Sequence, residues 1–131
     1  MDNLTPTLEY VTLGVDTHAE QHVAAALDER GRLLGTCSIP TTSSGFAELV
    51  RWASGYGELA QVGIEGTGSY GAGLARWLRA RSVAVVEVDR PDRRTRRRRG
   101  KSDTVDAEAA ARAVLAGIAT AQPKAGTGPM E

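Results

Sequence analysis

Four acidic residues stand at positions where carboxylates gather around a cation. Asp16 follows one short apolar run of the chain, and Glu65 follows another. Asp103 and Asp106 are three residues apart, so a helix would present them on one face. Clustered carboxylates repel each other unless a cation lies between them, and Mg²⁺ prefers such oxygen ligands. The pattern predicts a Mg²⁺ site, with Mn²⁺ as the alternative ion, of the kind that serves phosphoryl transfer.

Each acid also has an ordinary structural role that the sequence leaves open. Asp16 would cap the turn before His18, and Glu65 would pair with an arginine. Asp103 and Asp106 would compensate the dipole at the start of a helix. We favour the catalytic and metal-binding interpretation because the four acids occur together with a strongly basic segment.

That basic segment spans residues 90–101. The whole chain has 16 basic and 16 acidic residues and a formal net charge of zero. Half of the basic residues fall in this segment, where Asp92 is the single acid, so the segment carries a charge of +7. Such a concentration is typical of a nucleic-acid binder, and a solvated surface is the alternative. We expect the segment to be mobile and exposed without nucleic acid. The candidate nucleic-acid-binding residues are Arg90, Arg93, Arg94, Arg96, Arg97, Arg98, Arg99 and Lys101.

Apolar periodicity and turn formers predict the elements that must position these residues. The order is β-β-β-α-β-α-β-α, an α/β fold whose mixed sheet has three antiparallel strands followed by parallel strands. Residues 22–27 read as helix or strand, and the turn composition after them favours a strand. The other strands are expected over 10–15, 32–39, 60–64 and 83–88, and the helices over 43–54, 74–80 and 102–116.

The ends and faces of the helices follow from single residues. Ser43 is the expected N-cap of the first helix and Ser102 that of the last. Gly117 is expected to end the last helix. Its apolar positions are predicted to include Val105, Ala109, Ala113 and Leu115.

Composition indicates one globular domain at residues 10–116, with a loose arm at 1–9 and a disordered tail at 117–131. A hydrophobic content of 41% excludes a disordered chain, and the single cysteine excludes a disulfide framework. Cys37 is predicted to be a small core residue. No apolar run approaches the roughly 20 residues of a membrane span, and no export signal begins the chain. We therefore expect a cytoplasmic protein without membrane contacts.

Three segments of the chain resemble the N-terminal domain of the DEDD transposases of bacterial insertion sequences. They are GVDTHAEQHVAAALDERGRLL, GIEGTGSYGAGLARWL and VAVVEVDRPDRRTRRRRGKSDTVDAEAAARA, within about residues 10–116. The motifs DTH, EGTGSYG and KSDxxDA in this order make the resemblance fairly specific. It implies an RNase H-like (RuvC-like) fold and a Mg²⁺-dependent DNA recombination reaction. The implied partners are DNA, a structured guide (bridge) RNA and further copies of the chain. The family's acidic tetrad falls on Asp16, Glu65, Asp103 and Asp106.

One feature of the family has no counterpart in this sequence. Its members continue into a second domain that supplies a catalytic serine. The late hydroxyl residues Ser102, Thr120 and Thr127 match no such motif. We therefore expect a fragment that is inactive alone.

Three other interpretations fit parts of the sequence. Gly66, Gly68 and Gly71 fit a dinucleotide-binding GxGxxG, with Glu87 and Asp89 about 20 residues on. Only one further strand follows that motif, so the unit would be incomplete. A non-catalytic RNA- or DNA-binding module would use the arginine-rich segment alone. Finally, His18 and His22 would be zinc ligands on a helix, which a strand over 22–27 contradicts.

Overall fold

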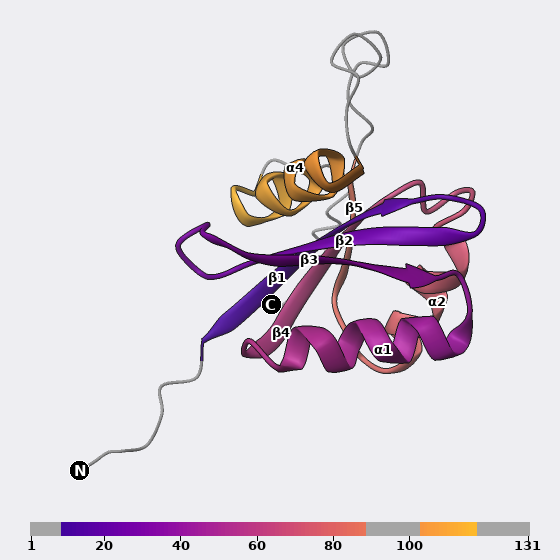
Figure 1. The fold of residues 1–131 in the computed structure, drawn as a ribbon, viewed down its shortest axis with the longest axis horizontal. Helices are drawn as coiled ribbons and strands as arrows, with labels where there is room; N and C mark the ends of the chain where they lie inside the picture. Colours follow the sequence, from indigo (N-terminus) through magenta and orange to yellow (C-terminus); the bar gives the residue numbers. More distant parts are fainter. Residues whose placement is uncertain (1–8, 89–102, 118–131) are drawn as a thin grey trace, which may run out of the picture.

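Five strands form one mixed sheet with helices on both faces (Figure 1). The computed structural model describes residues 9–88 and 103–117. Most of the expected arm, the whole basic segment and most of the expected tail lie outside these residues. The elements are β1 (Tyr10–Thr17), β2 (Gln21–Leu27), β3 (Leu33–Pro40), α1 (Ser43–Ser54), β4 (Glu58–Glu65), α2 (Ala72–Ala80), β5 (Val85–Val88) and α4 (Asp103–Leu115).

Strand β1 lies at the centre of the sheet, whose order is β3-β2-β1-β4-β5. It pairs antiparallel with β2 and parallel with β4. Strands β2 and β3 are antiparallel, and β4 and β5 are parallel. The predicted α/β fold, element order and mixed strand directions are confirmed, and residues 22–27 belong to a strand.

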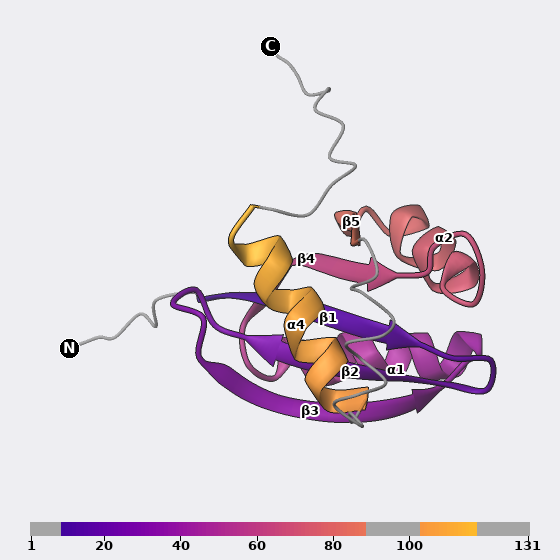
Figure 2. The same cartoon turned by 90° about the horizontal axis from the view of Figure 1, so that it is seen from above.

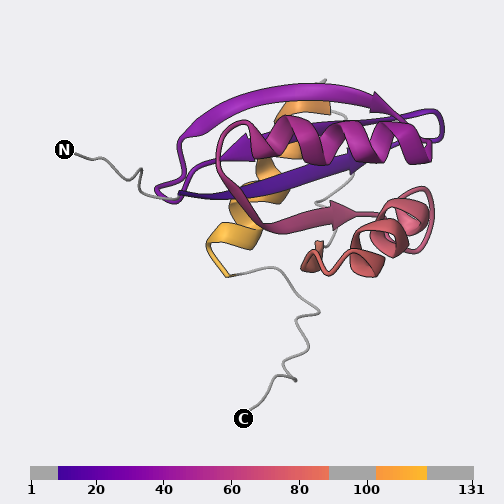
Figure 3. The ribbon, with the colours of Figure 1, turned by 90° about the horizontal axis from the view of Figure 1, so that it is seen from below.

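The two faces of the sheet carry different layers. Helices α1 and α2 cover one face, and α4 crosses the other (Figures 2 and 3). Because side chains alternate along a strand, Val11, Leu13 and Val15 of β1 join the core under α1 and α2. Gly14 and Asp16, between and beyond them, therefore face α4.

Helix α4 approaches the sheet through small residues. A Cβ on Gly14 would overlap the backbone of Ala107 and Ala111. A Cβ on Gly63 of β4 would overlap the side chain of Val114. The helix backbone therefore lies directly over Gly14 and the Val114 side chain lies over Gly63, and these two contacts fix the position of α4 across β1 and β4.

The predicted apolar face of α4 is wrong in part: Ala113 is half-buried and packs against the apolar cluster that includes Val114, and Leu115 is half-buried, but the other two positions are exposed. Val105 is 49% exposed, and Ala109 is exposed as well. Alanines lie all round this helix, so periodicity gives little guidance, and the residues that fit the glycines decide which face is buried. The buried apolar residues are Ala107, Ala110, Ala111 and Val114.

Some predicted ends also differ. Helix α1 is capped by Thr42, not Ser43: Thr42 has extended backbone and its Oγ1 accepts from the Gly45 N–H at 3.0 Å. Strand β5 begins at Val85, later than expected. Gly117, at a φ of 76°, follows the end of α4 as predicted, whereas Ser102 lies outside the described residues. No helix in the described ranges is long and apolar enough to span a membrane.

Replacing Gly14 by alanine should therefore destabilise the fold. The added methyl meets helix backbone, which yields less readily than a side chain, so the free energy of unfolding should fall by about 1–3 kcal/mol. Gly68→Ala is the control, because nothing lies within 4 Å of its added Cβ. Urea unfolding of both variants makes the comparison, and equal stability would contradict the packing of α4.

Candidate metal centre

The parallel pairing of β1 and β4 brings two acids to one edge of the sheet. Val15 pairs with Ile64, and Asp16 and Glu65 are the next residues on the two strands. The Thr17 hydroxyl donates to the backbone carbonyl of Glu65 at 2.9 Å, which joins the strand ends. Neighbouring strands lie about 4.8 Å apart, so the two carboxylates leave the sheet side by side.

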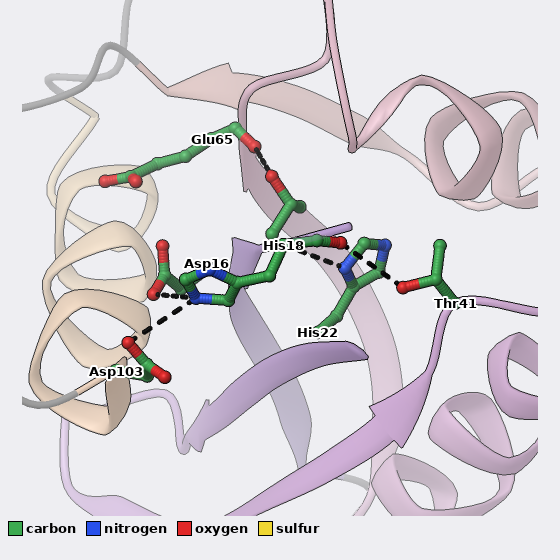
Figure 4. A network of polar contacts seen from close by, with 7 residues as sticks. Asp16, His18, His22, Thr41, Glu65 and Asp103 are labelled. Atoms are coloured by element: carbon green, nitrogen blue, oxygen red, sulfur yellow. Dashed lines mark hydrogen bonds and ion pairs between the residues drawn. The ribbon is translucent and has the colours of Figure 1, made fainter. Parts of the chain in front are cut away.

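Both acids point to the face that α4 covers. Asp16 is two residues from Gly14, and Glu65 is two residues from Gly63, so each shares the face of its glycine. Figure 4 shows the Glu65 side chain directed toward α4. Asp16 is 0% exposed and Glu65 is 1% exposed. The strands thus hold two carboxylates under the helix, almost without access to water.

The first turn of α4 brings two further acids to the same place. Asp106 is buried, and its charge acts on Asp16. The Asp103 side chain is 49% exposed, which places it at the rim. The positive end of the helix dipole partly offsets their negative charge. Asp103 and Asp106 thus lie near Asp16, and Glu65 lies beside Asp16 at the end of the neighbouring strand; Asp16, Glu65 and Asp106 are buried and Asp103 is at the rim.

Asp16 is the electrostatic centre of this group. Burial raises its pKa above the usual range, while contact with His18 lowers it and the charges of Asp106 and Asp103 raise it again. Its Oδ1 is buried and has no hydrogen-bond partner within the described part of the chain. A buried carboxylate oxygen among other carboxylates is a donor set that suits a hard divalent cation. The residues present therefore fit such an ion.

A histidine joins the group, in a place that the sequence analysis missed. His18 Nε2 lies 2.9 Å from Asp16 Oδ2 and 3.4 Å from Asp103 Oδ1 (Figure 4). Among the described residues, one ligand atom from each of these three side chains lies within 4.8 Å of the others. The Asp-x-His spacing was the available signal, since residues two apart at a strand end share a face.

His22, by contrast, takes no part in the acidic group. It lies in β2 and stacks on Phe46 of α1, with ring centroids 5.9 Å apart, on the opposite face of the sheet. Burial lowers its pKa. The zinc hypothesis for His18 and His22 required a helix, whereas His22 lies in a strand and its ring faces α1.

The glycine-rich turn after β4 is held together by its own backbone hydrogen bonds. Gly66 has a φ of 79°, which favours glycine. The N–H groups of Ser69 and Gly71 both donate to the Gly66 carbonyl, and that of Ala72 donates to the Ser69 carbonyl. These donors are already used within the turn, whereas a dinucleotide site needs free N–H groups for the pyrophosphate. The arrangement favours the turn as a support for Glu65.

The comparisons with known proteins concern the family and the fold. The family model of the DEDD transposases of the IS110 type, described as "Transposase", matches residues 13–125. No curated protein matches the chain.

Among solved structures, RuvC of Thermus thermophilus is similar in fold. Its complex with a Holliday junction substrate aligns at a TM-score of 0.55 and 13% identity, over 84% of this chain and 98% of RuvC. A second T. thermophilus RuvC structure aligns at a TM-score of 0.54 and 14% identity, over 83% of this chain and 98% of RuvC. A ROK family glucokinase from Streptomyces griseus aligns at a TM-score of 0.44 and 19% identity, over 60% of this chain. The chain spans 33% of the length of the glucokinase. The RuvC alignments show that the confirmed α/β fold is RNase H-like.

Removal of the Asp16 charge should stabilise the metal-free protein. Because the pKa of Asp16 is raised in the folded chain above its usual 3.8, stability falls as pH rises through the interval between the two values. Asp16→Asn should therefore be more stable than the parent at pH 7 in EDTA. This advantage should shrink as pH falls toward 4.

Both predictions are checked by urea unfolding across pH. Asp28→Asn is the control variant, and its expected change in stability has the opposite sign. The backbone N–H groups of Arg32 and Arg30 each donate to Asp28 at 2.9 Å and lower its pKa. This variant should lose stability at pH 7. An Asp16→Asn protein less stable than the parent at pH 7 would contradict the electrostatic account of the site.

Proposed function

This chain belongs to the DEDD transposase family, and on that premise we propose that it is the Mg²⁺-dependent catalytic domain of a DNA transposase, acting on phosphodiester bonds. The observation that carries the proposal is the register of β1 and β4, which sets Asp16 beside Glu65 beneath the acids of α4. Three separate parts of the chain, the ends of β1 and β4 and the start of α4, thus contribute carboxylates to the proposed site.

The four acids have different roles in this proposal. Asp16, Glu65 and Asp106 are the buried ligands, and Asp103 completes the set from the rim. A bound Mg²⁺ supplies Lewis-acid stabilisation of the negative charge that develops on phosphate oxygens. The strands fix the spacing of Asp16 and Glu65 through the backbone, which keeps them in place before substrate arrives. Burial under α4 limits water around the carboxylates and strengthens their electrostatic interactions.

The basic segment is proposed to hold the nucleic acid. It follows Val88 of β5, which pairs with Glu65, and it precedes Asp103 of α4. The nearest described residue before the segment pairs with Glu65, and the nearest one after it is Asp103, so the +7 segment is connected in sequence to two parts of the acidic site. Arginine contacts to phosphates give affinity largely independent of base sequence.

DNA is the proposed substrate, and the RuvC structure solved with a Holliday junction supports a polynucleotide at this fold. A structured guide RNA and further copies of the chain are proposed partners on the strength of the family resemblance. We also propose that strand exchange needs the serine-bearing domain of the family in addition to this one.

Two sets of substitutions should separate chemistry from affinity. Asp16→Asn removes a buried ligand, so Mg²⁺-dependent cleavage should fall by more than about 100-fold while DNA and RNA binding persists. Changing Arg96, Arg97, Arg98 and Arg99 to alanine should weaken binding to unrelated sequences. It should also reduce the salt slope, by about 0.7–0.9 for each phosphate that the protein no longer neutralises.

Binding is measured on this chain across a salt series. Cleavage is measured on the protein that carries the serine-bearing domain, with both sets of variants side by side. Normal cleavage by Asp16→Asn with intact binding would mean that the acids are structural. The chain would then be a nucleic-acid-binding module without catalysis.

A further inference from the structure

We propose that His18 is a ligand of the metal in this site and shifts its preference from Mg²⁺ toward first-row transition ions such as Mn²⁺. The inference rests on the proposed function, because it assumes that the acidic group binds a divalent cation. It adds a nitrogen ligand to a site otherwise made of carboxylates. That addition predicts which ion the site selects.

The positions of the ligand atoms carry the first step. His18 Nε2 is 2.9 Å from Asp16 Oδ2 and 3.4 Å from Asp103 Oδ1. Two ligand atoms about 2.1 Å from one octahedral ion, at right angles, lie about 3 Å from each other. The imidazole nitrogen is therefore separated from both carboxylates by the spacing of adjacent ligands of one ion.

The burial of Asp16 carries the second step. Its side chain is 0% exposed, and its Oδ1 has no hydrogen-bond partner within residues 9–88 and 103–117. The contact with His18 satisfies only Oδ2. The carboxylate at the centre of the group therefore has an unused acceptor, which a cation would fill.

The backbone of His18 is held on both sides, which fixes where the ring starts. Its N–H donates to His22 Nδ1 at 3.3 Å, and its carbonyl accepts from the Thr41 hydroxyl at 3.3 Å (Figure 4). His22 is itself locked by stacking on Phe46. The turn between β1 and β2 is thus anchored to β2 and to the segment after β3. This anchoring is the positioning that a ligand requires.

The chemistry of the ligand sets the selectivity. Carboxylate oxygens suit Mg²⁺ and Mn²⁺ alike, whereas imidazole suits transition ions and is a poor ligand for Mg²⁺. Coordination uses the Nε2 lone pair, so the ring carries its proton on Nδ1 and gives up the hydrogen bond to Asp16. A site with one imidazole and several carboxylates should therefore bind Mn²⁺ in preference to Mg²⁺.

Pulsed EPR of Mn²⁺ bound to this chain tests the assignment. A directly ligated imidazole gives a ¹⁴N coupling to the Mn²⁺ electrons, and the sequence has only two histidines. The coupling should be present in the parent and should change to the ¹⁵N pattern on histidine labelling. It should be lost in His18→Gln, which offers an amide oxygen instead. His22→Asn is the matched control and should keep it, because the amide oxygen can still accept from the His18 N–H.

Competition between Mn²⁺ and Mg²⁺ gives the second readout. His18→Gln should lower the ratio of Mn²⁺ to Mg²⁺ affinity by about tenfold or more. Bound Mn²⁺ without ¹⁴N coupling in the parent, or coupling that survives in His18→Gln, would overturn the inference and leave the proposed function standing. Failure of the chain to bind Mn²⁺ at all would overturn both.

Discussion

The parallel pairing of β1 with β4 is the constraint on which the rest of the site depends. It sets Val15 against Ile64, and the acids that follow these residues must then emerge together from adjacent strands. Alternation sends the apolar residues into the core under α1 and α2 and the acids to the other face. A slip of one residue in either strand would bury a carboxylate in the apolar core, so hydrophobic burial itself holds the register.

Close packing of α4 is the second half of the same arrangement. Gly14 leaves room for the backbone of Ala107 and Ala111 directly on the sheet, and Gly63 leaves room for the Val114 side chain. This contact brings the first turn of α4, with Asp103 and Asp106, over the ends of β1 and β4. Bulkier residues at the glycines would lift the helix and separate its acids from Asp16 and Glu65. The small residues thus serve the position of the acidic group as much as the packing of the core.

Gathering buried carboxylates costs stability, and the structure offsets this cost only in part. Burial raises the pKa of Asp16, the contact with His18 opposes that shift, and the charges of Asp106 and Asp103 add to it. Asp16 Oδ1 is buried and has no hydrogen-bond partner within the described residues, so the cost of burying this carboxylate is not fully offset. A divalent cation would neutralise the group and bind this oxygen. The buried carboxylates that lower the stability of the metal-free protein are therefore the ones that would bind the metal.

The sequence predicts the element order and the mixed sheet because the strands carry clear apolar runs and the turns carry their usual residues. The four acids could be singled out because strand ends and helix starts are recognisable. The buried face of α4 could not be predicted, since its alanines have no preferred side and Gly14 decides it from far away in the chain. The place of His18 in the acidic group was not predicted for a related reason. Its contact with Asp103 joins residues that are distant in sequence and close only in the fold.

An anomalous diffraction measurement on crystals of this chain soaked in Mn²⁺ tests the central claim most directly. The account predicts an anomalous peak beside the Asp16 carboxylate, among Glu65 and the acids of the first turn of α4. A peak elsewhere, or none at this place with the fold intact, would contradict the claim that the fold gathers these acids around a metal.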